Sequence, residues 1–324
     1  MASTEVTALS ETIAAQADLL ELALTVPVDE AAERIGRSRR VWLVGTGTSQ
    51  HAAELGALML ESGRRDVRWR SSAAFCADQP TLTAGDAVVI ISHTTKTAFA
   101  QRARAYAMQS GAGVVSITAH GRGWPEAIEA APLERAETYT ASYLAALVVL
   151  ARLGVAVGEP GFDSSQLSEL PGRVRAAAQA PGALAGAPER LLVLAGAGPA
   201  AVTAREGALK LREGAQLPAE GYEAEYLLHG TAVPLGPGDA LIAVQPSDDR
   251  FGLLELLTAA AASEGLEVRT VSEAGGLHPV LAQIPLTVRL QKLASDLADA
   301  RGTDPDKVIR GGWAGDRLWE AGAP

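Results

Sequence analysis

The sequence predicts an α/β protein made of two tandem three-layer α/β/α sandwiches, each built around a parallel sheet. Short β-branched runs bounded by glycine alternate with alanine-rich helical segments, as in strands that helices cover on both faces. The same landmarks occur twice along the chain at nearly constant spacing. A segment rich in proline and glycine separates the two copies.

Strands are expected at residues 40–47, 67–72, 86–93 and 113–118, and again at 190–198, 239–246 and 267–272. The offset between the two sets is 150 residues from Gly45 to Ala195. It is 153 between the Gly-Asp turns at 85–86 and 238–239, and 154 between the strands that begin at 113 and 267. An offset this constant predicts a duplicated α/β unit.

A chain of 324 residues is long for one core, so two domains of roughly 150 residues are expected. The Pro- and Gly-bounded stretch from Val157 to Arg190 gives the boundary. We therefore predict a helical lead-in (1–38), a first α/β domain (39–165), a linker helix (166–190), a second α/β domain (191–300) and a tail (301–324) near the active site.

Composition excludes several classes of function. The net charge of −10 argues against broad binding to nucleic acid or to an anionic membrane, which requires a basic surface. The single cysteine, Cys76, cannot form an internal disulfide and is expected to be a small buried residue. The sequence has no zinc-site spacing, no signal peptide and no bilayer-spanning apolar run, so we expect no metal and a cytoplasmic location.

Two loops rich in hydroxyl groups follow predicted strands and begin predicted helices. They read GTGTS (residues 45–49) and SHTTKT (residues 92–97). Backbone N–H groups and hydroxyls at a helix N-terminus favour an anion, and the two loops are expected at the same carboxyl edge of the sheet. The first loop matches neither a P-loop nor a dinucleotide fingerprint, so a phosphate monoester suits the pair best. The alternative is a tight turn in which Ser or Thr caps the helix.

Four segments together resemble a known family. GTGTSQHAA, SHTTKTAFA, ETYTASYLAAL and EGALKLREGAQLPAEGYEAEYLLHG are similar, in this order, to the landmarks of the tandem sugar isomerase (SIS) domains. The most similar members are the isomerase half of glucosamine-6-phosphate synthase, the phosphosugar isomerases, the aminosugar-phosphate deaminases and the fructosamine deglycases. The resemblance covers Val41 to Arg301. It implies a sugar phosphate as ligand and no cofactor.

The resemblance also implies which residues hold the phosphate. The matching hydroxyl positions are Thr48, Ser49, Ser92, Thr94, Thr97 and Ser142. His93, which we include in the predicted site, and Thr95 stand where the family has Gln and Gly, and Lys96 replaces Glu. These changes alter the shape of the loop and add a positive charge, which leaves open both the anion and the sugar that it binds. The alternative for His93 is a cap or loop histidine without a role in binding.

A polar stripe marks the helix that begins the fourth segment. Glu206, Lys210 and Glu213 are spaced i, i+4 and i+7, so they share one face. One reading is an exposed ion-pair ladder worth about 0.2–0.5 kcal/mol per pair. The other is catalysis of hydrogen transfer between C1 and C2 of a sugar, which needs a carboxylate, a ring-opening acid or base, and a donor for the enediol oxygens.

The resemblance favours catalysis. It implies that Glu213 moves the proton, that His229, 16 residues later, opens the ring, and that Lys210 and Glu206 shape the polar site. In relatives this histidine enters the site of a partner subunit, so a homodimer with a shared active site is expected. His51 is expected to be a helix residue, and His120 and His278, in predicted turns, are given no role.

The expected function is a phosphosugar isomerase that interconverts an aldose or amino-sugar 6-phosphate and its ketose through an enediol. The alternatives are an aminosugar-phosphate deaminase or fructosamine-phosphate deglycase, and a non-catalytic sugar-phosphate-binding regulator. We expect no glutaminase domain ahead of Val41. The tail lacks the family's lysine at the expected place, since Lys307 comes too early. Arg310 and Trp313 are the candidates there, and hydrophobic anchoring is the alternative for the tail tryptophans.

Overall fold

The structure is a computed structural model that describes residues 6–61, 65–158, 161–245 and 249–324. The elements of the first half are α1 (Ala8–Ala23), α2 (Asp29–Arg37), β1 (Arg40–Gly45), α3 (Thr48–Leu60), β2 (Asp66–Ser71), α4 (Ser72–Asp78), β3 (Asp86–Ile91), α5 (Ala98–Gln109), β4 (Gly113–Ala119), β5 (Ala127–Ala131) and α6 (Ala141–Ala156).

The second half begins with α7 (Ser164–Gln179). Its further elements are β6 (Leu192–Gly196), α8 (Pro199–Gly214), β7 (Ala219–Glu223), α9 (Ala224–Tyr226), the π-helical turn η1 (Leu227–Thr231), β8 (Ala240–Gln245), α10 (Leu253–Ser263), β9 (Glu267–Ser272), α11 (Gln283–Arg301), the 3-10 turn η2 (Gly311–Ala314) and α12 (Asp316–Trp319). Pro246, the predicted end of one strand, lies outside the described residues.

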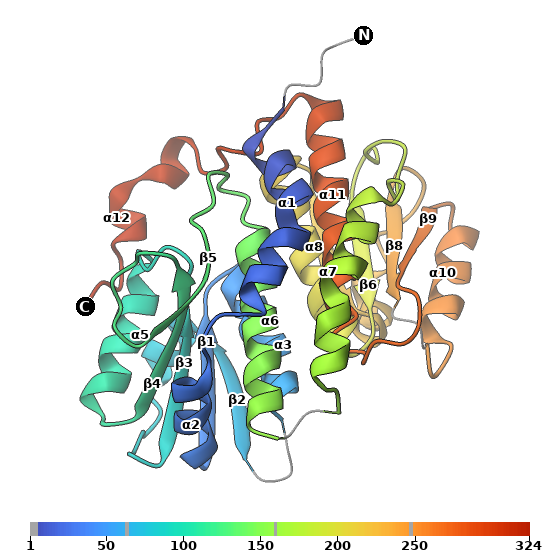
Figure 1. Cartoon of the computed structure of the whole chain (residues 1–324). Coiled ribbons are helices and arrows are strands. Elements are labelled where there is room, and N and C mark those ends of the chain that lie inside the picture. Colours follow the sequence, from blue (N-terminus) through green and yellow to red (C-terminus); the bar gives the residue numbers. More distant parts are fainter. Residues whose placement is uncertain (1–5, 62–64, 159–160, 246–248) are drawn as a thin grey trace. The chain divides into compact units, whose positions relative to one another are not determined.

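The strands form two parallel sheets, in the order β2-β1-β3-β4-β5 and β7-β6-β8-β9 (Figure 1). Helices cover both faces, as alternate residues of β6 show. Leu192 and Leu194 pack in one apolar cluster with residues of α8 and α11, whereas Val193 and Ala195 pack in another with residues of α9 and α10. This arrangement confirms the predicted α/β class with two parallel sheets, and burial of both faces explains the continuous apolar strands.

The duplicated unit is visible in matching strand-to-helix turns. A Cβ at Gly45 would lie 2.2 Å from the carbonyl oxygen of Ser49, and one at Gly196 would lie 2.4 Å from that of Ala200. Only glycine fits where the helix backs so closely onto its strand. The equivalent of Gly45 is therefore Gly196, at an offset of 151. The pairing with Ala195 expected from the sequence is wrong by one residue.

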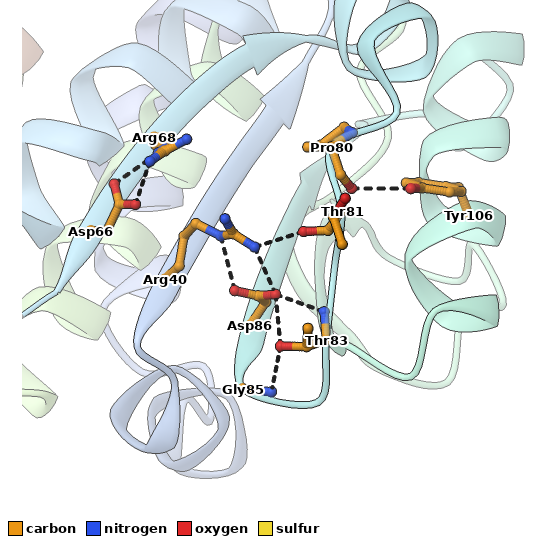
Figure 2. A network of polar contacts seen from close by, with 9 residues as sticks. All are labelled: Arg40, Asp66, Arg68, Pro80, Thr81, Thr83, Gly85, Asp86 and Tyr106. Carbon is orange, nitrogen blue, oxygen red and sulfur yellow. Dashed lines mark hydrogen bonds and ion pairs between the residues drawn. The ribbon is translucent and has the colours of Figure 1, made fainter.

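A second equivalence involves two buried aspartates at the starts of central strands, Asp86 as the first residue of β3 and Asp239 directly before β8. Asp86 accepts a hydrogen bond from the Thr83 amide (2.7 Å), and Asp239 accepts one from the Gly236 amide (2.9 Å). Figure 2 shows that Arg40 also reaches Asp86, with its Nε 2.9 Å from Oδ1. Burial raises the pKa of Asp86, but the hydrogen bonds from Arg40 and Thr83 outweigh it, so the net pKa is lowered. The predicted 153-residue offset holds at these two turns.

Two strands were not predicted from the sequence, β5 and β7. Their sequences, AIEAA and AEGYE, contain one β-branched residue between them, so neither resembles a buried parallel strand. β7 lies at a sheet edge, where Gly221 packs so closely on α8 that a Cβ would be 2.4 Å from the Cα of Arg205. This strand is specified by its contact with the helix rather than by its own β-propensity.

The chain forms two compact units. The β6 unit contains the second sheet and extends over Leu170–Val308, together with the start of α1 and the segment Arg135–Thr140. The β1 unit contains the first sheet, over Asp18–Glu134 and Ala141–Glu169, and also Ile309–Pro324. The site residues are described below unit by unit.

Candidate functional site

The first hydroxyl loop, in the β1 unit, joins β1 to α3. Gly47 is the N-cap of α3, so no side chain caps this helix, and Thr48 and Ser49 lie half-buried in its first turn. The alternative in which Ser or Thr caps the helix is therefore wrong here. The turn puts two hydroxyl side chains beside the first N–H groups of a helix, where the partial positive charge favours an anion.

The second hydroxyl loop follows β3 and contains a buried hydroxyl group that makes no hydrogen bond to the described residues. Ser92 is only 4% exposed, and its Oγ has no hydrogen-bond partner within the described part of the chain. Thr97 is the N-cap of α5, yet its side chain makes no capping hydrogen bond. Thr94 accepts a hydrogen bond from the Lys96 amide at 3.3 Å. A buried polar atom without a partner calls for an explanation, and an anion at this loop would supply one.

Thr95 and His93 show what the departures from the family pattern do. Thr95 has φ of 60°, a left-handed conformation that glycine adopts easily and a β-branched residue does not. The imidazole of His93 accepts a hydrogen bond at Nε2 from the Glu134 amide, at 3.1 Å. Burial lowers the pKa of His93, Glu134 opposes the shift and Arg122 adds to it. The Nε2 geometry makes His93 a hydrogen-bond acceptor, and the lowered pKa favours the neutral ring that this role requires.

Ser142, at the start of α6, is already bonded to a carboxylate. Glu134 accepts hydrogen bonds from the Ser142 amide (2.8 Å), from the Ala141 amide (3.2 Å) and from the Ser142 hydroxyl. The N-terminus of α6 is therefore occupied by an anion from the chain itself. Sequence reasoning missed Glu134, because it lies eight residues before Ser142 and outside any capping spacing.

The β6 unit brings Glu206, Lys210 and Glu213 together on α8. The Lys210 Nζ lies 2.5 Å from Glu213 Oε2 and 3.5 Å from Glu206 Oε1. It also donates a 3.0 Å hydrogen bond to the carbonyl oxygen of Tyr139. The side chains of Lys210 and Glu206 are fully buried, and that of Glu213 is 23% exposed. Because two of the three side chains are buried, the interpretation as an exposed ion-pair ladder is wrong. Buried charged groups are stable only when they are paired, as they are here.

His229 lies in the turn η1, also in the β6 unit. Its φ and ψ of −86° and 48° leave the helical range. The side chain is 73% exposed, and its Nε2 is 3.9 Å from Glu225 Oε1. Within the ranges that the structure describes, His229 makes this contact and none with Glu206, Lys210 or Glu213, which we call the Lys210 cluster. The structure therefore does not bring His229 into contact with Glu213.

The tail is attached to α5 by its last residues rather than by its tryptophans. The Arg102 guanidinium donates hydrogen bonds to the carbonyl oxygens of Gly322 (2.6 Å) and Ala323. Trp313 and Trp319 are 77% and 55% exposed. The expectation of hydrophobic anchoring through these rings is wrong. Two further expectations concern α3 and α4: His51 is a helix residue, as expected, whereas Cys76 is half-buried rather than buried.

Neither a metal cluster nor a membrane span is found in the described residues. In residues 6–61, 65–158, 161–245 and 249–324, no three His, Cys, Asp or Glu side chains converge as metal ligands. No helix in those ranges combines the length and the apolar composition that crossing a bilayer requires.

Comparison with known families decides the classification. The model of the SIS domain matches residues 35–123 and 187–271, which together make up more than half of the chain. The chain belongs to the SIS domain family. The two matched segments contain β1 to β4, β6 to β8 and all but the last residue of β9, so most of both sheets of this SIS protein is part of the match, whereas β5 lies outside it.

Individual relatives agree with this classification. The SIS protein is 27% identical to glutamine–fructose-6-phosphate aminotransferase (isomerizing) of Thermococcus kodakarensis, over 86% of this chain and 52% of the relative. It thus spans about half the length of the curated relatives that it matches.

Two solved structures share the fold. Tagatose-6-phosphate ketose/aldose isomerase from Escherichia coli gives a TM-score of 0.76 at 16% identity and covers 94% of this chain and 97% of that one. Glucosamine-6-phosphate deaminase from Thermotoga maritima also gives a TM-score of 0.76, at 17% identity, and the match covers 95% of this chain and 99% of that one.

Proposed function

We propose that this SIS protein is a phosphosugar isomerase that interconverts an aldose or amino-sugar 6-phosphate and its ketose. The observation that carries the proposal is the Lys210 cluster. A fully buried ammonium group holds, at 2.5 Å, a carboxylate that is itself 23% exposed. A carboxylate fixed in position yet within reach of a ligand is what a proton-transfer step requires.

The proposed reaction gives Glu213 and Lys210 separate tasks. The Glu213 carboxylate takes the proton from C2 of the open-chain aldose. The C2–H electron pair forms the C1–C2 double bond, the π pair of the C1 carbonyl moves to O1, and O1 takes a proton from solvent to give an enediol. Glu213 then returns its proton to C1 as the C2–O2 double bond of the ketose forms and the O2 proton passes to solvent. Lys210 acts as a positioning residue, since its hydrogen bonds to Glu213 and to the Tyr139 carbonyl fix the orientation of the base.

The hydroxyl loops supply the binding of phosphate in this proposal. Among the described residues, the buried Ser92 Oγ has no hydrogen-bond partner, and the Thr97 side chain makes no capping hydrogen bond to α5. Thr48 and Ser49 lie at the beginning of another helix. Phosphate oxygens accept hydrogen bonds from hydroxyls and from helix N-terminal amides, so both loops suit a phosphate monoester.

A homodimer completes the proposed site. His229 is 73% exposed and contacts Glu225 of its own chain, so ring opening by this histidine is assigned to the site of a partner subunit. Exposed apolar side chains surround it in sequence, with Tyr226, Leu228 and Val233 at 60%, 53% and 84% exposure. Light scattering after size exclusion tests the dimer. Mixing inactive Glu213→Gln and His229→Asn proteins should restore part of the activity if sites are shared.

Release of ammonia from an aminosugar phosphate is the second candidate function. The relatives that support it are an aminotransferase and a deaminase by name. Deamination and isomerisation share the proton transfer at C2 and differ in whether the amino group leaves.

The test is a panel of aldose, ketose and aminosugar 6-phosphates, followed by NMR for interconversion and by an ammonia assay. Interconversion without ammonia is the expected result. Ammonia release would favour the deaminase. Specific binding of a sugar phosphate with no turnover of any kind would contradict both enzymes and would leave the regulator.

A further inference from the structure

A second loop lies beside the Ser92–Thr97 loop in the β1 unit, at the carboxyl end of β4. β3 and β4 are adjacent parallel strands, and their pairing continues past their ends. The Ala119 amide donates to the His93 carbonyl oxygen at 2.9 Å, and the Ser92 amide donates to that of Ile117 at 3.0 Å. The residues that follow Ala119 therefore begin next to the candidate phosphate loop.

Arg122 is the charged residue of this second loop. It stands between Gly121 and Gly123, whose φ values of 69° and 77° make a tight left-handed turn on either side of it. The turn is fixed by the Gly121 amide, which donates to Glu129 at 2.7 Å. This glycine-flanked geometry holds the arginine backbone in place without using its guanidinium group.

The guanidinium of Arg122 carries one donor, Nε–H, that is unsatisfied within the described part of the chain. Its Nε is buried and makes no hydrogen bond to any of the described residues. Its charge also acts on His93, whose pKa is lowered chiefly by burial and further by Arg122. A buried N–H without a partner is unfavourable, so a ligand that accepts this hydrogen bond gains affinity from it.

A carboxylate at the start of α6 means that a phosphate bound nearby needs a positive charge beside it. Glu134 already occupies this helix N-terminus through both amides and the Ser142 hydroxyl, and its own amide is bonded to His93. A phosphate dianion at the neighbouring loop would meet this carboxylate with no compensating charge from α6. Like charges a few ångströms apart repel strongly in a partly buried site, so a nearby positive charge is required.

We infer that Arg122 binds the phosphoryl group of the ligand, with its Nε–H and charge directed at the anion that the unpartnered Ser92 hydroxyl also contacts. The inference rests on the proposed function. It adds a ligand-binding arginine outside the four segments that resemble the family. It also explains how the loop can hold a phosphate dianion beside the Glu134 carboxylate. The positive charge of the guanidinium offsets the repulsion, and its planar N–H groups match the phosphate oxygens.

The experiment compares Arg122→Gln and Arg122→Lys with Arg37→Gln, which loses the same charge from an exposed pair on α2. The dissociation constants of fructose 6-phosphate, glucosamine 6-phosphate and inorganic phosphate are measured by calorimetry. Arg122→Gln should weaken all three by about 10- to 100-fold, as expected for a charge-assisted hydrogen bond. Arg122→Lys should weaken them less, and Arg37→Gln should stay within about twofold of wild type.

Three outcomes would overturn the inference. If wild type binds these phosphates and Arg122→Gln binds them equally well, the arginine assignment is wrong and the proposed function stands. If wild type binds none of the sugar phosphates, the proposed function fails and the inference with it. If Arg122→Gln without ligand melts more than about 5 °C below wild type, Arg122 supports the fold instead, since an unpartnered group should contribute little stability.

Discussion

Lys210 donates a 2.5 Å hydrogen bond to Glu213 from a side chain that is fully buried, and Glu213 is the cluster member that reaches solvent. The cation is therefore enclosed between a buried carboxylate, Glu206, and an accessible one. Removing Lys210 or Glu206 changes the charge balance of a buried region, where water screens charges little.

Lys210→Met should destabilise the protein by roughly 3–5 kcal/mol, because it leaves the buried Glu206 carboxylate without its cation. Urea denaturation gives the free energy of unfolding. Lys292→Met is the control, since Lys292 pairs with Asp296 at a partly exposed site on α11 and should lose less than about 1 kcal/mol. Adding Glu206→Gln to Lys210→Met should recover part of the loss. If the Lys210 variant is as stable as the Lys292 variant, the buried cluster is not organised as described.

Glu134→Ala should destabilise the β1 unit by about 1–2 kcal/mol, because the start of α6 loses the acceptor for two amides and a hydroxyl. Glu33→Ala, which removes an exposed i,i+4 partner of Arg37, should cost about 0.5 kcal/mol or less. The comparison uses thermal and urea unfolding. Equal losses in the two variants would contradict the capping role.

Asp86 predicts a loss of stability in acid. Its pKa is lowered on folding, so the folded state favours the carboxylate and the unfolded chain binds the proton more readily. The stabilisation is present above the ordinary value of 3.8 and is lost as the pH falls below it towards the lowered value. The free energy of unfolding of Asp86→Asn should accordingly depend less steeply on pH below about 4 than that of wild type. An unchanged slope would contradict this linkage.

His93 predicts a second pH dependence, in a different range. Its pKa is lowered below 6.5 on folding, chiefly by burial, so the unfolded chain binds more protons there. Stability should fall as the pH drops from 6.5 towards the lowered pKa. In ¹⁵N NMR spectra Nε2 should be unprotonated at pH 6.5, since it accepts from the Glu134 amide. A pKa of 6.5 or above, or a protonated Nε2, would contradict the neutral acceptor.

The sequence predicts those parts of the molecule that depend on local pattern. Apolar runs and glycine turns predict the central strands, and helical spacing puts Glu206, Lys210 and Glu213 on one face. The same spacing is compatible with an exposed ladder, and only the packing of α8 decides for burial. The weakly β-prone edge strand β7 escapes prediction for the same reason, since its contact with the helix specifies it.

Contacts through backbone atoms, and contacts between a loop and a distant residue, produce no periodic pattern in the sequence. The Tyr139 carbonyl that accepts from Lys210 belongs to a segment 71 residues away. Glu134 accepts hydrogen bonds at the start of α6 from Ala141, seven residues later in the chain, and from Ser142, eight residues later. Arg122 is notable only once Ala119 is seen to pair with His93. Such residues are found from geometry, because their roles arise from the tertiary fold rather than from spacing.

The most direct test of the central claim is exchange of the C2 hydrogen of a sugar 6-phosphate with solvent deuterium, followed by ¹H NMR. Wild-type protein should catalyse the exchange. Glu213→Gln should reduce it by about 100-fold or more while the dissociation constant of the sugar phosphate changes little, as expected when a general base alone is lost. Exchange by Glu213→Gln at the wild-type rate would contradict the account.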